Sequence, residues 1–231
     1  MVFDYYPITK IPVTDNKILQ LKSLPDLPLC DLVTLSSGTA DETGHSLWRG
    51  SLVFQAWAST NLSMFSGLRL LELGTGCGAS GIFLAASLSD NNDGERQSTS
   101  LNLTDGDPAT LDLANENLNL NSHLLHPSIN VSCSVLPWTT TPSPPSTPFD
   151  VIFATDVIYD TSILPPLLST VSTNLKRKGG KFVLAHIPRA NADGSAAVGT
   201  EEQLGKVIAD SAEKFNLGLV EKVVVNPGEE G

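Results

Sequence analysis

Residues 68–78 read Leu-Arg-Leu-Leu-Glu-Leu-Gly-Thr-Gly-Cys-Gly, and this stretch decides the fold. Its first six residues are mostly apolar and are typical of a buried strand, while the apolar run at 82–86 has the character of a helix. Gly74, Gly76 and Gly78 lie between the two. Glycines permit a tight turn and a close approach of the backbone to a ligand. The stretch therefore predicts a strand, a ligand-binding glycine loop and a helix.

Similar units alternate on both sides of this loop. The sequence predicts strands at 17–21, 100–105, 129–136, 149–154, 181–187 and 220–225, and helices at 47–61, 108–118, 165–180 and 201–216. The polar run 90–100 and the Pro/Ser/Thr-rich run 139–148 are expected to be surface loops. Alternating strands and helices indicate a Rossmann-like, doubly wound α/β fold with a mostly parallel sheet. We expect residues 1–45 to form an N-terminal extension with short strands, and 46–231 to form the main domain.

Composition narrows the function classes. The chain has 231 residues, 41% of them hydrophobic and 17% charged, which suits one folded domain. Its formal net charge of −11 argues against a general nucleic-acid binder, because such binding relies on clustered Lys and Arg. A basic protein substrate is compatible with this charge, although surface acid that only keeps the chain soluble would look the same.

Cysteine usage and hydropathy set further limits. Cys30, Cys77 and Cys133 are far apart, and neither they nor His123 and His126 show the spacing of a metal site, so no metal is expected. The sequence shows no signal peptide and no apolar run of membrane-spanning length. We therefore expect a cytoplasmic, possibly nuclear, protein that does not contact membranes and is a monomer.

Residues around the loop indicate which ligand it holds. The loop alone also fits a dinucleotide, because Gly74 and Gly76 with Ala79 satisfy the relaxed dinucleotide pattern. Glu72 stands just before the glycines, where a carboxylate would repel a pyrophosphate but attract an ammonium group. Asp105 ends the second strand of the unit, where an acid can accept hydrogen bonds from two ribose hydroxyls. These features favour S-adenosylmethionine, held by Gly74, Thr75, Gly76 and Gly78.

Trp138 follows the third strand of this unit and offers an aromatic neighbour for adenine. Packing in the core is an equally good reason for an aromatic residue at that place. The choice between these two readings stays open at the level of sequence.

The joint pattern resembles methyltransferase family 16, the protein-lysine methyltransferases of the seven-β-strand, class I group. The resemblance covers roughly residues 44–187 and is carried by three motifs. These are Leu-Trp-Arg-Gly-Ser at 47–51, Leu-Leu-Glu-Leu-Gly-Thr-Gly-Cys-Gly at 70–78 and Asp-Val-Ile-Tyr at 156–159. The glycine motif alone is typical of the superfamily, and only the combination indicates the family.

The resemblance implies roles for individual residues. A Trp before the glycine motif lines the cofactor site in this family, which matches Trp48, and the acid after the second strand matches Asp105. A Leu-x-Trp after the third strand matches Trp138, and the small residue before the Asp-x-x-Tyr motif would be Thr155. The family's sheet ends in a hairpin of strands six and seven. Here the sequence leaves nothing for a seventh strand, so we expect either a truncated chain or an incomplete sheet, which would have an exposed edge.

Asp156 and Tyr159 are the candidate catalytic residues. Methyl transfer from a sulfonium is an in-line displacement, which requires alignment and exclusion of water. A lysine nucleophile must lose a proton, at a cost of roughly 4–5 kcal/mol at pH 7. The Asp156 carboxylate could orient the incoming ammonium, and Tyr159 could position the amine. A turn or cap role for Asp156 and a packing role for Tyr159 would explain the same residues.

Three functions remain open at this level. The first is methylation of a lysine on a protein substrate, and the second is methylation of a small-molecule amine. The third is a non-catalytic binding module that keeps the methyltransferase fold. Nucleic-acid methylation is disfavoured, because enzymes of that kind carry two prolines where this chain has Val157 and Ile158.

Overall fold

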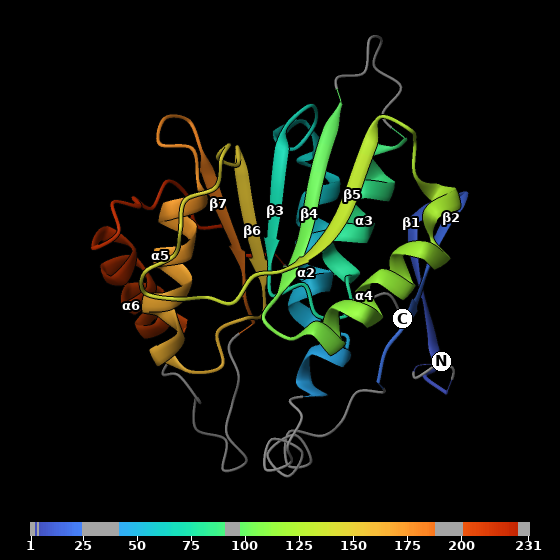
Figure 1. Ribbon diagram of the computed structural model, residues 1–231, viewed down its shortest axis with the longest axis horizontal. Coiled ribbons are helices and arrows are strands. Elements are labelled where there is room, and N and C mark those ends of the chain that lie inside the picture. The colour runs from blue at the N-terminus through green and yellow to red at the C-terminus, as the bar shows by residue number, and fades with distance from the viewer. Residues whose placement is uncertain (1–2, 4, 25–41, 91–97, 188–200, 226–231) are drawn as a thin grey trace.

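The computed structural model describes residues 3, 5–24, 42–90, 98–187 and 201–225. A five-stranded parallel sheet forms its centre, with helices on both faces, and a two-stranded hairpin lies beside it (Figure 1). The sheet strands are β3 (Arg69–Leu73), β4 (Thr99–Asp105), β5 (Ile129–Val135), β6 (Val151–Thr155) and β7 (Lys181–Ala185). The main helices are α2 (Arg49–Ser59), α3 (Ala79–Leu88), α4 (Pro108–Leu120), α5 (Leu164–Asn174) and α6 (Glu201–Glu213).

The strand order is β5-β4-β3-β6-β7, and all neighbouring strands run parallel. The chain builds outward from β3 in one direction through β4 and β5, and then returns to the other side of β3 with β6 and β7. The switch point therefore lies at the carboxyl end of β3, where ligands bind in folds of this kind. The predicted Rossmann-like α/β fold is confirmed.

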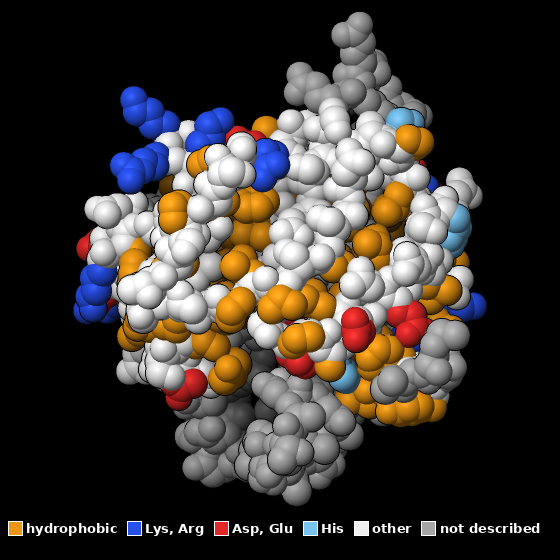
Figure 2. Space-filling view, in the orientation of Figure 1, with side chains coloured by type: hydrophobic (Ala, Val, Ile, Leu, Met, Phe, Trp, Pro, Cys, Tyr) orange, Lys and Arg blue, Asp and Glu red, His pale blue; other side chains and the backbone are white. Residues whose placement is uncertain are grey.

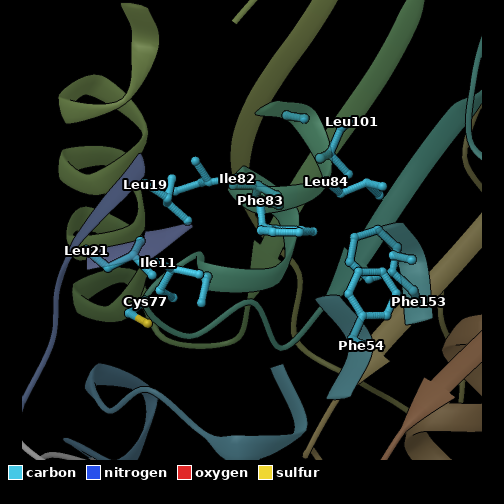
Figure 3. Close-up of a cluster of buried hydrophobic side chains, with 14 of the residues drawn as sticks. Ile11, Leu19, Leu21, Phe54, Cys77, Ile82, Phe83, Leu84, Leu101 and Phe153 are labelled. Carbon is cyan, nitrogen blue, oxygen red and sulfur yellow. The ribbon is translucent and has the colours of Figure 1, made fainter. Parts of the chain in front are cut away.

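Alternation along the strands divides the core into two clusters. Leu70 and Phe153 face one cluster, which also contains side chains from α2, α3 and the hairpin (Figure 3). Leu71 and Ile152 face the other, beneath α5 and α6. Period-two alternation explains why adjacent residues of one strand point into opposite layers. In the first cluster the rings of Phe54 and Phe153 stack with centroids 4.8 Å apart.

The hairpin of β1 (Ile8–Thr14) and β2 (Lys17–Lys22) is attached to the domain through α4. Asn121 Oδ1 accepts the Gln20 N–H at 2.9 Å, and its Nδ2 donates to the Gln20 carbonyl at 2.7 Å. Asn117 makes the same pair of bonds with Lys22, at 2.7 and 2.8 Å, and also donates to the Cys77 carbonyl at 2.8 Å. Two amides thus take the place of a neighbouring strand along β2, and Asn117 links the hairpin to the glycine loop.

We expect Asn117→Ala to lower the free energy of unfolding by about 3 kcal/mol, because one buried backbone group of Cys77 and two part-buried groups of Lys22 lose their hydrogen bonds to this side chain. Urea denaturation would measure the change. Asn119→Ala is the matched control, since Asn119 lies on the same helix but is exposed. Equal unfolding free energies for the two variants would show that water or a shifted neighbour replaces the Asn117 bonds.

The predicted strand at 220–225 is wrong. Residues 217–225 form no strand, and Val220 and Val224 are 98% and 71% exposed. The run was predicted from its valines, but a strand also needs a hydrogen-bonded neighbour, and within the described residues β7 pairs with β6 alone. Other elements differ from the prediction mainly at their ends, and α5 ends at Asn174, ahead of the glycine pair at 179–180.

Part of the expected surface loop at 90–100 lies outside the described residues, and β4 already begins at Thr99. In the portion of the chain that the structure describes, no helix has both the length and the apolar character needed to cross a membrane.

Candidate active site

The glycine loop after β3 has the backbone conformation that its sequence predicts. Gly74, Gly76 and Gly78 have φ values of +68°, +55° and +87°, a region that favours glycine. Gly78 precedes the first residue of α3, so the loop leads straight into a helix N-terminus. A side chain at Gly74 would meet Val157 at 2.8 Å and the Trp138 ring at 3.1 Å. The loop is therefore tightly enclosed by residues that follow β5 and β6.

Glu72 is the most unusual group at this edge, because its side chain is completely buried. Its Oε2 accepts a hydrogen bond from the Thr75 hydroxyl at 2.6 Å, whereas Oε1 has no hydrogen-bond partner within the described residues. Burial raises the pKa of Glu72 to about 8, against the lowering effect of bonds from Thr75 and the Gly81 backbone. The chain thus holds a carboxyl group with one unused oxygen beside the glycine loop.

Asp105 lies at the end of β4, directly beside the loop. Its Oδ2 accepts the Gly76 N–H and its Oδ1 accepts the Asp107 N–H, both at 3.1 Å. Burial raises the pKa of Asp105 above its ordinary value, and the backbone hydrogen bonds oppose that rise. Asp107 in turn caps α4 by accepting hydrogen bonds from Ala109 and Thr110, as the sequence predicts.

Trp138 lies where the sequence predicts it, with its ring against Gly74. Its Nε1 is buried and has no hydrogen-bond partner in the described parts of the chain. A buried indole N–H usually finds an acceptor. The ring also packs against the core cluster beneath α5 and α6, so a role of Trp138 toward a ligand stays a prediction.

The segment before α2 covers the glycine loop from the other side. A side chain at Gly76 would lie 2.9 Å from the Gly44 carbonyl oxygen, and the Cys77 thiol lies 3.8 Å from the Ser46 carbonyl oxygen. Trp48 is the residue just before α2, and its indole N–H donates to the Thr43 carbonyl at 2.9 Å. Trp48 is thereby attached to η1 (Glu42–His45), the turn that packs on the loop.

Thr155, the last residue of β6, joins the two helices that start at this edge. Its hydroxyl lies 3.4 Å from the Ser51 hydroxyl of α2 and 3.1 Å from the Ser80 hydroxyl of α3. All three residues are buried. Thr155 therefore connects the Trp48 segment to the helix that follows the glycine loop.

Asp156 connects three elements through its carboxylate. Oδ2 accepts the Gly50 N–H in the first turn of α2 at 2.6 Å, and Oδ1 accepts the Ile187 N–H beyond β7 at 3.0 Å. A side chain at Gly50 would lie 2.5 Å from the Asp156 carboxyl carbon, so it would force the carboxylate out of its present position. Asp156 has a φ of +53°, and its side chain is 3% exposed. The structure thus gives Asp156 a capping contact, while its catalytic role stays a prediction.

The other candidate catalytic residue, Tyr159, is 63% exposed in the loop after β6. It lies three residues beyond Asp156, where an incoming side chain could reach it. His186 also belongs to this edge, although sequence reasoning missed it. Its Nδ1 is 3.6 Å from Asp156 Oδ1, and its side chain is 8% exposed. Its place near the end of the parallel strand predicted at 181–187 could have indicated His186 as a residue of this edge.

We expect Asp156→Asn to lower the free energy of unfolding by about 2–3 kcal/mol. An amide has one oxygen for two N–H donors, so Gly50 or Ile187 would face an NH₂ group, and α2 would lose a negative charge at its N-terminus. Guanidinium denaturation would measure this. Asp112→Asn removes an exposed acid from α4 and is the control. A variant as stable as the wild type would show that the two backbone bonds contribute nothing to folding.

The parallel sheet, the glycine loop and the acids at the ends of β3 and β4 together define the Rossmann-like fold of the S-adenosylmethionine-dependent class I methyltransferases. Residues 31–196 match the family model of methyltransferase family 16, described as lysine methyltransferase. The chain belongs to this lysine methyltransferase family.

Comparisons with individual proteins are more distant. The chain is 28% identical over 156 residues to a Bos taurus protein named protein-lysine N-methyltransferase EEF2KMT, a match that covers 58% of this chain and 44% of that protein. It therefore spans less than half the length of this relative. Similar solved structures include an S-adenosylmethionine-dependent methyltransferase from Aquifex aeolicus (17% identity, TM-score 0.47, 71% of this chain and 81% of that one). Another is the YcgJ protein of Bacillus subtilis, with 12% identity and a TM-score of 0.45. That match covers 71% of this chain and 68% of the YcgJ chain.

The residues at this edge fit S-adenosylmethionine. The buried Glu72 carboxyl has an oxygen without a partner in the described residues, and an ammonium group is the partner such an oxygen needs. The Trp138 ring lies against the loop, and the Asp105 carboxylate is already oriented by two backbone N–H groups. The left-handed glycines keep side chains away from the same region. A cationic nucleoside ligand requires carboxyl groups for its charge and hydroxyls, an aromatic ring for its base, and glycine backbone that it can approach closely.

Proposed function

We propose that this chain uses S-adenosylmethionine to methylate a lysine side chain of a protein. The observation that carries the proposal is the buried Glu72 beside a left-handed glycine loop and Asp105, with one carboxyl oxygen that no described residue contacts through a hydrogen bond. Membership of the lysine methyltransferase family and the relative named as a protein-lysine methyltransferase support lysine as the acceptor. The formal net charge of −11 is compatible with a basic segment as substrate.

The bound cofactor supplies a methyl group on a positively charged sulfur. The protein's own residues then have three tasks. Glu72 and Asp105, which already bond to Thr75 and to the Gly76 N–H, would hold polar groups of the cofactor, and the left-handed Gly74–Gly78 loop would let the backbone lie close to it. Asp156 fixes α2 and the end of β7 around the site. The exposed ring of Tyr159 is available to align the acceptor amine, which must have lost its proton to attack.

Two other functions share this site. A small-molecule amine could accept the methyl group, and a non-catalytic module could bind cofactor without transferring it. The choice of a protein acceptor rests on the family and on the acidic chain. A cytoplasmic or nuclear location, where basic protein segments are abundant, is part of the same proposal.

Labelled transfer separates these functions. The chain is incubated with a cell lysate and S-adenosylmethionine carrying a labelled methyl group, and label is followed in protein bands and in the small-molecule fraction. We expect label in protein, released as methyl-lysine after hydrolysis, and much less with Tyr159→Ala. The Tyr5→Ala variant is the control, because Tyr5 is also an exposed tyrosine (74%) but precedes β1 and does not follow a strand of the parallel sheet.

Calorimetric titration with S-adenosylmethionine completes the test. Label confined to small molecules would replace the lysine proposal with the second function. Cofactor binding without any labelled product, or no cofactor binding at all, would favour the non-catalytic module.

A further inference from the structure

Five of the chain's 14 Lys and Arg residues lie at the end of the sheet opposite the cofactor edge. Lys176, Arg177 and Lys178 form the turn after α5, Lys181 begins β7, and Arg69 begins β3. All five are exposed. Figure 2 shows Lys and Arg side chains gathered at this end of the molecule, where Figure 1 places the turn between α5 and β7. This concentration stands out in a chain whose formal net charge is −11.

The cations surround a hollow rather than a flat surface. A cavity of about 360 Å³ is lined by Lys176, Lys178 and Lys181. Met64, Leu68 and Val151 add apolar side chains to the lining, and Ser63 and the Lys176-paired Asp150 also belong to it. We call this cavity, with Arg69 and Arg177 beside it, the basic hollow. It combines positive charge with an apolar surface large enough for one or two side chains.

Existing contacts neutralise only part of this charge. Lys176 Nζ lies 3.0 Å from Asp150 Oδ1, and a bond from the Arg69 backbone together with Lys176 lowers the pKa of Asp150 below its usual range. The Arg69 guanidinium donates to the Thr147 carbonyl at 3.3 Å and lies over the Phe149 ring. In the described part of the chain, Asp150 is the acid that pairs with this cluster. Lys178 and Lys181 remain as exposed charges at the rim.

We propose that the basic hollow is a docking site for an acidic segment of a partner protein that carries an apolar side chain among its carboxylates. The carboxylates would contact the lysines, and the apolar side chain would cover Met64 and Leu68. The hollow faces away from the glycine loop, because it lies at the amino ends of β3 and β6. The proposal therefore concerns a second site, and it stands whether or not the chain methylates lysine.

Charge distribution favours a protein segment over a nucleic acid. Charges are screened beyond about 8 Å at physiological ionic strength, so a short segment senses mainly the five local cations. A duplex would extend beyond them onto the rest of the surface, which carries the chain's excess of acid. The apolar residues of the lining also give no advantage to a phosphate backbone, whereas a Leu or Phe side chain gains from being buried against them.

Fluorescence anisotropy tests the proposal with the full chain and a labelled peptide of Asp and Glu residues around one central Leu. We expect binding that weakens with added salt. Lys178→Glu combined with Lys181→Glu should weaken it by about tenfold or more, because two attractions become repulsions. Lys10→Glu combined with Lys206→Glu is the matched control, since both lysines are exposed but lie on β1 and α6. This control should bind within about twofold of the wild type.

Two further probes decide between occupants. The same peptide with Ser in place of Leu should bind more weakly, and a short RNA duplex should bind more weakly than the Leu peptide. Equal peptide binding by the wild type and the Lys178/Lys181 variant would overturn the proposal. Equal binding of the Ser peptide or of the duplex would also overturn it, because the hollow would then be a general polyanion site. Circular dichroism of each variant verifies that the fold is kept.

Discussion

Replacing Glu72 with Gln will stabilise the folded chain by about 4 kcal/mol near pH 8, yet weaken its binding of S-adenosylmethionine. The stabilisation follows from the raised pKa of Glu72, about 8 in the folded chain against an ordinary value of 4.5. As pH rises above the unfolded value, the unfolded chain releases this proton while the folded chain keeps it. Folding stability therefore falls between about pH 4.5 and pH 8, and the loss levels off above the folded pKa.

Gln is a close structural substitute at this position. Its carbonyl oxygen can accept the Thr75 hydroxyl bond that Oε2 accepts now, and its NH₂ group takes the place of Oε1, which accepts no hydrogen bond from the described residues. Because Gln does not ionise, the two proteins should differ by only about 1 kcal/mol near pH 5 and diverge as pH rises. Urea denaturation at a series of pH values would measure the divergence. Glu213→Gln, an exposed acid on α6, is the control and should follow the wild type.

The loss of cofactor affinity also follows from removing the ionisable group, because the cofactor's ammonium needs the carboxylate that Gln cannot form. An ammonium group beside Glu72 would favour the ionised carboxylate, so binding near pH 7 should release a proton. Calorimetric titration in buffers with different ionisation enthalpies would detect that proton. The Gln variant should bind about a hundredfold more weakly and release none from this site. Parallel stability curves for wild type and variant, or equal affinities, would contradict the assignment of Glu72 as the buried partner of the ammonium.

The positions of side chains at the carboxyl ends of single strands could be predicted from the sequence. The strand at 68–73, the glycine loop and Asp105 depend on local patterns and on the rule that parallel strands end at one edge. Its place after the third strand made Trp138 either a neighbour of the ligand or a packing residue, and the structure places its ring both against Gly74 and against the core cluster beneath α5 and α6. These predictions needed only residue type and position along a strand.

Contacts between distant segments could not be read from those patterns. Asp156 and Gly50 are 106 residues apart, and nothing local indicates that the carboxylate binds that backbone N–H. The burial of Glu72 likewise depends on Gly81 of α3, where a side chain would collide with the carboxyl group. The strand predicted at 220–225 is wrong for a related reason. Its valines favour a strand, but strand propensity acts only where a neighbouring strand is present. Local sequence predicts elements, whereas tertiary neighbours decide the state of each side chain.

Gly76→Ala will reduce affinity for S-adenosylmethionine by more than about tenfold and will destabilise the fold by about 2–4 kcal/mol. Gly76 has a φ of +55°, which strains any residue with a Cβ atom. The added methyl group would also lie 2.9 Å from the Gly44 carbonyl oxygen, a backbone atom that cannot rotate away. Relief requires the loop or η1 to move, and either shift disturbs the Gly76 N–H bond to Asp105.

Gly179→Ala separates the strain of the backbone from the collision in the loop. Gly179 has a φ of +78°, but a side chain there would meet no atom within 4 Å, and the residue lies at the opposite end of the sheet. This variant should lose only about 1–2 kcal/mol of stability and keep the wild-type cofactor affinity. Calorimetric titration and urea denaturation of both variants give the comparison. If Gly179→Ala weakened cofactor binding as much as Gly76→Ala did, general destabilisation would explain the loss, and the glycine loop would no longer be the place where the cofactor binds.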